Sequence, residues 1–234
     1  MDATRTAGGF SIGVESPRAE IPDPRHDGDG GGGRRLSVRP FTRLTAVAAP
    51  LDVPDVDTDR IVPARFLRKP QSAGYGQFLF HDVRFDAEGR ERPDFVLNQP
   101  PYRRAQILVA ADNFGCGSSR EMAVWALAGW GFRCVIAPSF GDTFVEHCAR
   151  NGVLAVVLAG PTCAALRRQL HQGPGGTMTV DREEQSVAAA NGTLHRFTID
   201  AVRKQALLTG QDDSDEEIAA FEARGASEAP LPPP

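Results

Sequence analysis

The sequence predicts an α/β fold with a partly parallel sheet, and two observations indicate it. Between Ile107 and His171, short apolar runs alternate with longer segments whose apolar residues recur at helical spacing. Such an alternation is typical of parallel strands joined by covering helices. In addition, 41% of the 234 residues are hydrophobic, which is enough to build one core.

The strands of the predicted sheet are short apolar runs bounded by turn residues. The first run leads into an acidic, turn-rich segment, 52–60, and the second leads into a glycine-containing turn. In chain order the predicted strands are Leu44–Ala49, Ile107–Ala111, Cys134–Ala137, Val153–Leu158, Met178–Val180 and Leu194–Ile199.

The helices are predicted from apolar spacing and from signals at their ends. Ser118 and Glu121 have the spacing of a capping box, so a helix is predicted to begin at Ser118 and to end at Gly129 and Gly131. Pro63 favours the start of a short helix. The other predicted helices are Ile61–Leu67, Thr143–Arg150 with an Asn151-Gly152 stop, Thr162–His171, Asp200–Leu208 and Glu216–Arg224.

Both ends of the chain are predicted to lie outside the folded domain. Residues 1–40 contain the glycine run Gly30–Gly33, scattered prolines and few large apolar side chains, so a disordered N-terminal extension is expected. It has no apolar segment of the kind found in secretory signals. Residues 225–234 are expected to form a flexible C-terminal tail. The domain itself is predicted over 41–224.

Composition argues against several classes of partner. The formal net charge of −4 argues against nucleic acid, because phosphate binding favours a basic surface. No apolar run approaches the roughly 18 residues of a membrane span. The cysteines lack C-x-x-C and zinc-finger spacing, so no metal site is expected, and for the last three the simplest interpretation is buried thiols in a cytoplasmic protein. They are Cys116, Cys134, Cys148 and Cys163.

The segment Asn113–Glu121 holds the most informative chemistry. It lies between a predicted strand and a predicted helix and brings together Ser118, Ser119 and Arg120 after a glycine turn. Backbone N–H groups and the positive end of a helix dipole favour negative charge there. The segment therefore suits a carboxylate ligand, or a serine that transiently carries negative charge. The alternative for Ser118 is a plain helix cap, and for Arg120 a solvated surface charge.

This segment resembles the signature of the swivelling domain of the aconitase superfamily. Six further motifs, in the same order along the chain, resemble bacterial isopropylmalate isomerase small subunits. They are Val56–Pro63 (VDTDRIVP), Phe66-Leu67 with Gly74–Gly76, Asp94–Asn98 (DFVLN), Val135–Phe140 (VIAPSF), Asn151–Leu154 (NGVL) and Arg196–Asp200 (RFTID).

The resemblance covers about residues 41–224 and implies a three-layer β/β/α swivelling domain. It also implies a large-subunit partner that holds a [4Fe-4S] cluster, with no cluster ligand on this chain, so Cys116 is not expected to be one. The implied reaction dehydrates 2-isopropylmalate to isopropylmaleate and rehydrates it to 3-isopropylmalate in leucine biosynthesis.

The resemblance also implies roles for individual residues. Ser118 would be the catalytic base, acting as an alkoxide, and Arg120 would bind a substrate carboxylate in a bidentate way that lysine cannot reproduce. The remaining candidates would lie near the substrate. They are Gly117, Ser119, Asp59 in the Asp57-Thr58-Asp59 turn, and Phe66, Leu67 and Arg68. A polar turn remains the alternative for Asp59, and core packing for Phe66.

Three departures from the family pattern leave the substrate open. Met122 stands where histidine is usual, Ser72 lies near a usual arginine, and the segment 210–215 is shorter and more acidic. Two alternatives arise from them: a sister hydro-lyase acting on another substituted malate or a citrate-like acid, and a non-catalytic regulatory partner of a large subunit. His81, His147 and His171 show no ligand pattern in the sequence.

Overall fold

The computed structural model describes residues 40–71 and 74–209, all of which belong to the unit Gly31–Pro234. Several predictions lie outside the described residues. These are the N-terminal extension over 1–39, the departure at Ser72, the acidic segment 210–215, the helix Glu216–Arg224 and the tail 225–234.

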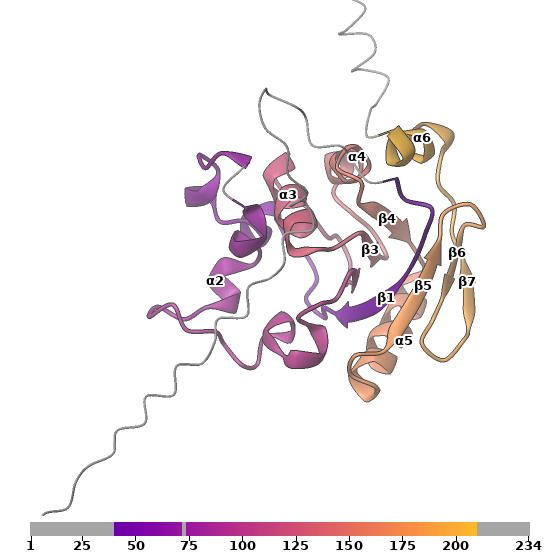
Figure 1. The fold of residues 1–234 in the computed structure, drawn as a ribbon, viewed down its shortest axis with the longest axis horizontal. Helices are drawn as coiled ribbons and strands as arrows, with labels where there is room; N and C mark the ends of the chain where they lie inside the picture. Colours follow the sequence, from indigo (N-terminus) through magenta and orange to yellow (C-terminus); the bar gives the residue numbers. More distant parts are fainter. Residues whose placement is uncertain (1–39, 72–73, 210–234) are drawn as a thin grey trace, which may run out of the picture. The chain divides into compact units, whose positions relative to one another are not determined.

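The fold is built on a mixed sheet of seven strands in the order β4-β3-β2-β1-β5-β6-β7 (Figure 1). The strands are β1 (Arg43–Pro50), β2 (Ile107–Val109), β3 (Cys134–Ala137), β4 (Leu154–Val157), β5 (Thr177–Asp181), β6 (Ser186–Ala188) and β7 (Leu194–Arg196). Strands β1 to β4 are parallel, and β5, β6 and β7 continue the sheet with antiparallel pairs. The prediction of an α/β fold with a partly parallel sheet is therefore confirmed.

Strand β1 joins the two parts of the sheet because it changes partner along its length. Residues 43–47 pair antiparallel with β5, and residues 48–50 pair parallel with β2. Burial changes at the same point: the first half is partly exposed, and Ala48, Ala49 and Pro50 are buried. The parallel end of β1 thus lies inside the core, as expected for a strand covered on both faces.

Helices and short 3-10 turns fill the connections. The helices are α1 (Thr58–Ile61), α2 (His81–Arg84), α3 (Glu121–Trp130), α4 (Asp142–Arg150), α5 (Gly160–Gln172) and α6 (Ala201–Thr209). The described 3-10 turns are Ala64–Phe66, Tyr75–Phe78, Val96–Asn98 and Pro100–Tyr102. The long β1–β2 connection carries α1 and α2 to one side of the sheet, where they lie beside α3 (Figure 1).

The two faces of the parallel strands belong to two different cores. On one face, Leu108 and Val135 pack in a cluster that includes residues of α3 and α4, such as Leu127. On the other face, Ile107 and Ile136 pack in a cluster with residues of α5, β5, β6 and α6. Alternate side chains of a strand point to opposite faces, so burial on both faces explains why these strands are continuous apolar runs in the sequence.

A close approach of two glycines sets the position of α3. A Cβ atom on Gly76 would lie 2.4 Å from the carbonyl group of Gly129, and one on Gly129 would lie 2.6 Å from the Gly76 nitrogen. Gly129 therefore lies inside α3 and allows the β1–β2 connection to contact its backbone. The prediction that Gly129 helps to end the helix was wrong; Gly131, with φ 119°, takes the C-cap position.

One further local prediction was wrong, and one strand was missed. The helix predicted over Ile61–Leu67 is instead α1, which ends at Ile61, followed by the 3-10 turn Ala64–Phe66. Asp57 determines this start, because its carboxylate accepts a hydrogen bond from Arg60 N at 2.7 Å and caps α1. Strand β6 was not predicted, because three residues are too few to show an alternating pattern.

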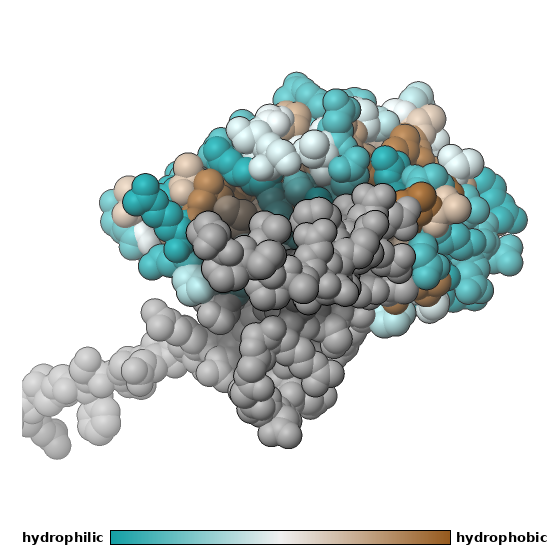
Figure 2. All heavy atoms as spheres, turned by 90° about the horizontal axis from the view of Figure 1, so that it is seen from above, coloured by the Kyte–Doolittle hydropathy of each residue, from teal (hydrophilic) through white to brown (hydrophobic). Residues whose placement is uncertain are grey.

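Surface hydrophobic groups among the described residues are dispersed. Figure 2 shows a face where hydrophilic residues dominate and hydrophobic ones occupy small separate areas. The large hydrophobic residues that are exposed, Val157, Leu194 and Val202, come from three different elements. No helix within the described ranges combines the length and the apolar character that a membrane crossing requires.

Candidate active site

Three loops meet beyond the carboxyl ends of β1, β2 and β3. The loop after β2 lies between the other two: Gly115 N donates to Val56 O at 2.7 Å, and Phe114 N donates to Ser139 O at 3.1 Å. Short parallel bridges, Asp57 to Cys116 and Phe114 to Phe140, repeat this pattern. Ligands of open α/β sheets commonly bind at this edge, so the geometry directs attention to the turn 113–120.

Thr58, in the connection after β1, holds the turn in place with two hydrogen bonds. Its backbone N donates to Cys116 O at 3.0 Å, and its hydroxyl donates to Ser118 O at 2.9 Å. Thr58 is buried. Because both contacts are made to carbonyl groups, the side chain of Ser118 remains uninvolved and its backbone is fixed.

Gly115 is required where the turn meets α4. Its φ is 72°, and a Cβ atom there would lie 2.3 Å from the ring of Phe144. Gly141 has a matching constraint, since its Cβ would lie 2.3 Å from Gly115 O. Only glycine combines this backbone conformation with so close an approach.

Ser118 lies on the exposed side of the turn and is not a helix cap. Helix α3 begins at Glu121, and its N-cap residue is Arg120, whose φ of −133° is extended. The predicted capping box was therefore wrong. Gly117, with φ 87°, and the contacts of Thr58 hold the preceding residues out of the helix. Within residues 40–71 and 74–209, no group hydrogen-bonds to the Ser118 hydroxyl.

The turn also carries backbone donors without an acceptor. The N–H groups of Ser118, Ser119 and Arg120 donate to no acceptor among the described residues. They precede the N-terminus of α3, where the helix dipole is positive. A negatively charged group at this place would meet several unused donors.

Arg120 forms an ion pair with Asp59 across the turn. One guanidinium nitrogen, Nη1, contacts Asp59 Oδ1, and no described residue hydrogen-bonds to Nε or Nη2, so these two nitrogens can serve a ligand. The Arg120 side chain is 19% exposed and that of Asp59 is 51% exposed. The structure thus brings two of the predicted site residues, Asp59 and Arg120, into direct contact.

Ser119 contacts a histidine that the sequence did not single out. Its Oγ lies 2.8 Å from Nε2 of His147 on α4, and Nδ1 of the same ring lies 2.9 Å from Nη2 of Arg150. Burial, and then the charge of Arg150, lower the pKa of His147. The sequence signal was indirect: helix α4 follows the strand next to β2, so its residues share the edge of the sheet where the turn lies.

The predicted residues Phe66, Leu67 and Arg68 lie on the β1–β2 connection. Phe66 stacks on Phe78 with ring centroids 4.3 Å apart, and it packs with Leu67 against the core, while Arg68 is exposed. The Tyr75 hydroxyl donates to Phe66 O at 3.2 Å. Among the described residues, no hydrogen bond, ion pair or ring contact joins these three to the turn 113–120.

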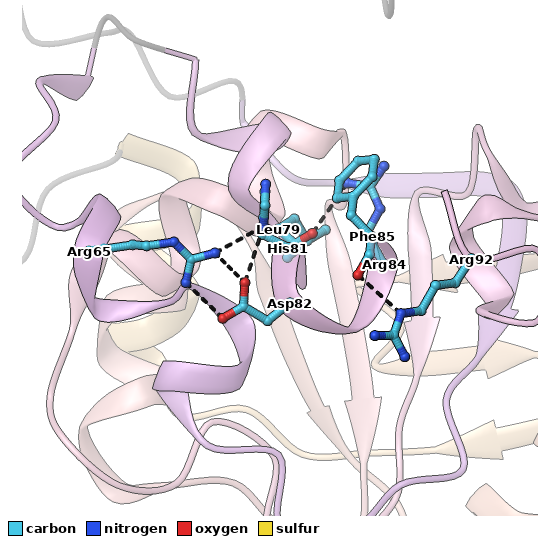
Figure 3. Close-up of polar contacts among 7 residues, drawn as sticks. All are labelled: Arg65, Leu79, His81, Asp82, Arg84, Phe85 and Arg92. Atoms are coloured by element: carbon cyan, nitrogen blue, oxygen red, sulfur yellow. Dashed lines mark hydrogen bonds and ion pairs between the residues drawn. The ribbon is translucent and has the colours of Figure 1, made fainter. Parts of the chain in front are cut away.

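Charged groups hold α2 in place within this connection. Figure 3 shows Arg65 pointing toward Asp82 and His81, and Arg84 reaching the backbone oxygen of Leu79. The hydrogen bond from Arg65 lowers the pKa of Asp82 to about 2, so its carboxylate is ionised at neutral pH. These contacts stabilise the connection. They involve no residue of the turn 113–120, where the candidate reactive groups lie.

The four cysteines do not form a metal centre. Burial raises the pKa of each thiol, to about 11 for Cys163, and Cys116 is also raised by the charges of Asp57 and Asp55. Thiolate is the form that binds metals. In the part of the chain that the structure describes, no three His, Cys, Asp or Glu residues lie close enough to hold a metal ion.

Comparison with known proteins identifies the family. Residues 38–161 match the family described as the aconitase C-terminal domain. The 3-isopropylmalate dehydratase small subunit of Rhodospirillum centenum is 50% identical over 196 residues, or 81% of this chain and 97% of the relative. That of Gluconobacter oxydans is 49% identical over 190 residues, or 79% of this chain and 91% of the relative. This chain belongs to the 3-isopropylmalate dehydratase small subunits.

A solved structure supports the fold. The structure of 3-isopropylmalate dehydratase from Methanocaldococcus jannaschii covers 79% of this chain and 99% of its own, with a TM-score of 0.56 and 20% identity. At that identity the likeness concerns the fold alone. The family match and the identity with the relatives confirm the resemblance inferred from seven sequence motifs. They also confirm the swivelling domain of the aconitase superfamily that this resemblance implied.

Proposed function

We propose that this chain is the small subunit of a heteromeric hydro-lyase that isomerises 2-isopropylmalate to 3-isopropylmalate in leucine biosynthesis. The observation that carries the proposal is the 50% identity with a 3-isopropylmalate dehydratase small subunit over 97% of its length. The proposal extends to the domain limits: a swivelling domain over about 41–224, with an extension at 1–40 and a tail at 225–234.

The proposed chemistry removes water from one pair of neighbouring carbons and returns it in the opposite sense. Dehydration takes a proton from the carbon beside a carboxylate and a hydroxide from its neighbour, and gives isopropylmaleate. Rehydration adds a hydroxide to the carbon that lost the proton and a proton to the carbon that lost the hydroxide. Ser118 is proposed as the base, and its exposed hydroxyl, which bonds to no described residue, agrees with that role.

Three features favour a negative charge on Ser118. They are the unused N–H groups of the turn, the positive end of α3, and the guanidinium of Arg120. Each such donor contributes about 2–4 kcal/mol where charge develops in an enzyme site. Gly117 supplies the backbone geometry of the turn, with φ 87°.

Arg120 is proposed to bind a carboxylate of the acid, with Asp59 holding the opposite side of its guanidinium. Nε and Nη2 of a guanidinium form a planar pair that matches the two carboxylate oxygens. Since the ion pair with Asp59 uses only Nη1, this second edge is available. Ser119 is proposed as a further contact to the same acid, and Phe66, Leu67 and Arg68 as the segment that selects its side chain.

The partner is proposed to be the large subunit, which would hold a [4Fe-4S] cluster. The thiols of this chain have raised pKa values, and among the described residues no three His, Cys, Asp or Glu side chains are grouped to hold a metal, so they do not fit the role of cluster ligands. When present, the cluster would act as the Lewis acid for the leaving hydroxyl. A cytoplasmic location is also proposed, since the four cysteines are free thiols, which a reducing compartment maintains.

The test uses the complex with its large subunit. The two chains are co-purified, the cluster is reconstituted without air, and the absorbance of isopropylmaleate is followed after addition of isopropylmalate. Turnover of isopropylmalate is expected. Turnover of other substituted malates or citrate-like acids alone would identify a sister hydro-lyase, and tight association without turnover of any acid would identify a regulatory partner.

A further inference from the structure

Three side chains form a hydrogen-bonded chain that ends at the site turn. Arg150 Nη2 lies 2.9 Å from His147 Nδ1, and His147 Nε2 lies 2.8 Å from Ser119 Oγ. His147 and Arg150 are one turn apart on α4. Because both ring nitrogens are engaged, rotating the ring by half a turn would place carbon atoms against both partners.

The direction of these hydrogen bonds follows from Arg150. A guanidinium can only donate, so His147 Nδ1 accepts and carries no hydrogen. Burial, and next the charge of Arg150, lower the pKa of the ring, while Glu121 on α3 and Glu146 on α4 act in the opposite direction. A neutral imidazole then has its single hydrogen on Nε2, and Nε2–H donates to Ser119 Oγ.

Ser119 is consequently left with a hydroxyl hydrogen to donate. A serine hydroxyl has one O–H donor and two acceptor lone pairs, and His147 occupies one lone pair. Ser119 is exposed and lies between Ser118 and Arg120. In the described ranges, no acceptor takes the Ser119 hydrogen, so it is available to a ligand at the turn.

A second hydrogen-bonded link joins α3 and α4 near this contact. Asn151 Nδ2 donates to Glu121 Oε1 at 2.9 Å and to the backbone oxygen of His147 at 2.8 Å. The amide of Asn151 thereby ties the start of α3 to the end of α4. It also holds the Glu121 carboxylate, the one acidic group that faces His147 from α3.

We propose that His147, oriented by Arg150, is a positioning residue that makes Ser119 a hydrogen-bond donor to a carboxylate oxygen of the bound hydroxy acid. The nature of the acid rests on the proposed function. A donor that is oriented beforehand stabilises charge growing on the carboxylate without reorganisation. His147 itself does not touch the acid, and its effect passes entirely through Ser119.

The kinetic test is a double-mutant cycle in the complex with the large subunit. Ser119→Ala and His147→Leu are each expected to lower kcat/KM about 10- to 100-fold, the range for one hydrogen bond to a charged group. The double variant should be no more than about twofold worse than Ser119→Ala, because both changes remove one interaction. Losses that multiply, so that the double variant is about 10-fold or more worse than Ser119→Ala, would overturn the proposal.

Two matched variants separate positioning from folding. His147→Gln provides an amide that can donate to Ser119 and accept from Arg150, so it should recover kcat/KM to within about threefold of the unmodified chain. His195→Leu removes a histidine from β7 and should leave the kinetics unchanged. A Gln variant as inactive as His147→Leu would contradict the proposed role.

The tautomer can be tested without substrate or partner. Long-range nitrogen-15 NMR of the full chain at pH 7.5 should show His147 with its hydrogen on Nε2. A hydrogen on Nδ1, or on both nitrogens, would overturn the inference and leave the proposed function intact. Failure of the unmodified complex to turn over isopropylmalate would overturn the proposed function before any variant is made.

Discussion

The parallel and antiparallel parts of the sheet differ in burial and in the connections that leave their strands. Every residue of β2 and β3 is buried, whereas β5 is exposed or partly exposed at alternate positions and β7 at every position. The antiparallel strands β6 and β7 are joined by a tight turn at Gly192, with φ 84°. The parallel strands instead lead into the loops that form the candidate site.

The difference shows how topology gathers reactive groups. Parallel strands cannot be joined by hairpins, so each needs a long crossover that leaves from the same edge of the sheet. The crossovers after β1, β2 and β3 supply Thr58, the turn 113–120 and the loop at Ser139, which bond to one another. The antiparallel part completes the second core and contributes none of the predicted site residues.

Removal of the Ser118 hydroxyl should give the largest effect. Ser118→Ala is expected to lower kcat of the complex roughly 10²–10⁴-fold, the usual contribution of a base, while association with the large subunit is retained. The matched change in the antiparallel part is Thr179→Ala, which removes a β5 hydroxyl that bonds to Thr45. It should leave kcat unchanged, and equal losses in the two variants would contradict the comparison.

Two glycines with similar backbone conformations test how tightly each part is packed. Gly115→Ala must place a methyl group against Phe144, so it should lower the free energy of unfolding by about 2–4 kcal/mol. Gly192→Ala meets open space and should cost only the backbone strain, about 1–2 kcal/mol. Denaturant unfolding measures both, and a larger loss at Gly192 would be inconsistent with tighter packing at the site turn.

Arg120→Lys should raise KM for the acid about tenfold and change kcat less, because an ammonium cannot form the planar pair of hydrogen bonds. A tenfold change in KM corresponds to about 1.4 kcal/mol of binding free energy. Arg196→Lys on β7, where the arginine side chain is 65% exposed, is the control and should leave KM as it was. Steady-state kinetics of both complexes measure the two KM values. An unaltered KM in Arg120→Lys would exclude Arg120 from the site.

The smallest effect is expected at Asp82, on the crossover that supports the site. Arg65 depresses the pKa of this carboxylate from 3.8 to about 2, so its stabilising contribution is present above pH 4 and is lost as pH falls through 2. Since Asp82 is 55% exposed, solvent screening limits that contribution to about 0.5–1 kcal/mol. The difference in unfolding free energy between the parent and Asp82→Asn should shrink accordingly from pH 7 to pH 2; a difference independent of pH would argue against the ion pair.

The sequence predicted the parallel part well because its local signals and its tertiary environment agree. Strands buried on both faces are continuous apolar runs, and β3 was predicted with its observed limits, Cys134–Ala137. The motifs of the turn and of its neighbours also identified the family. Strand β6 was not predicted because its three residues are too few to show a periodic pattern of hydrophobicity.

The site itself was only partly predictable. Ser118 and Glu121 have the spacing of a capping box, but Thr58 and Gly117 hold the turn out of the helix, and α3 begins at Glu121. One of these two residues, Thr58, is 60 positions away from Ser118 in the sequence, so no local pattern contains its contribution. The contact of His147 with Ser119 likewise depends on how α4 packs beside the turn.

The most direct test of the central claim is a crystal structure of the complex of this chain, its large subunit and bound isopropylmalate. We predict a carboxylate of the acid on Arg120 and Ser119, with Ser118 Oγ within about 3.5 Å of the carbon that loses its proton. An acid bound away from the turn 113–120, or a Ser118 hydroxyl that faces no substrate carbon, would contradict the proposed role of this turn.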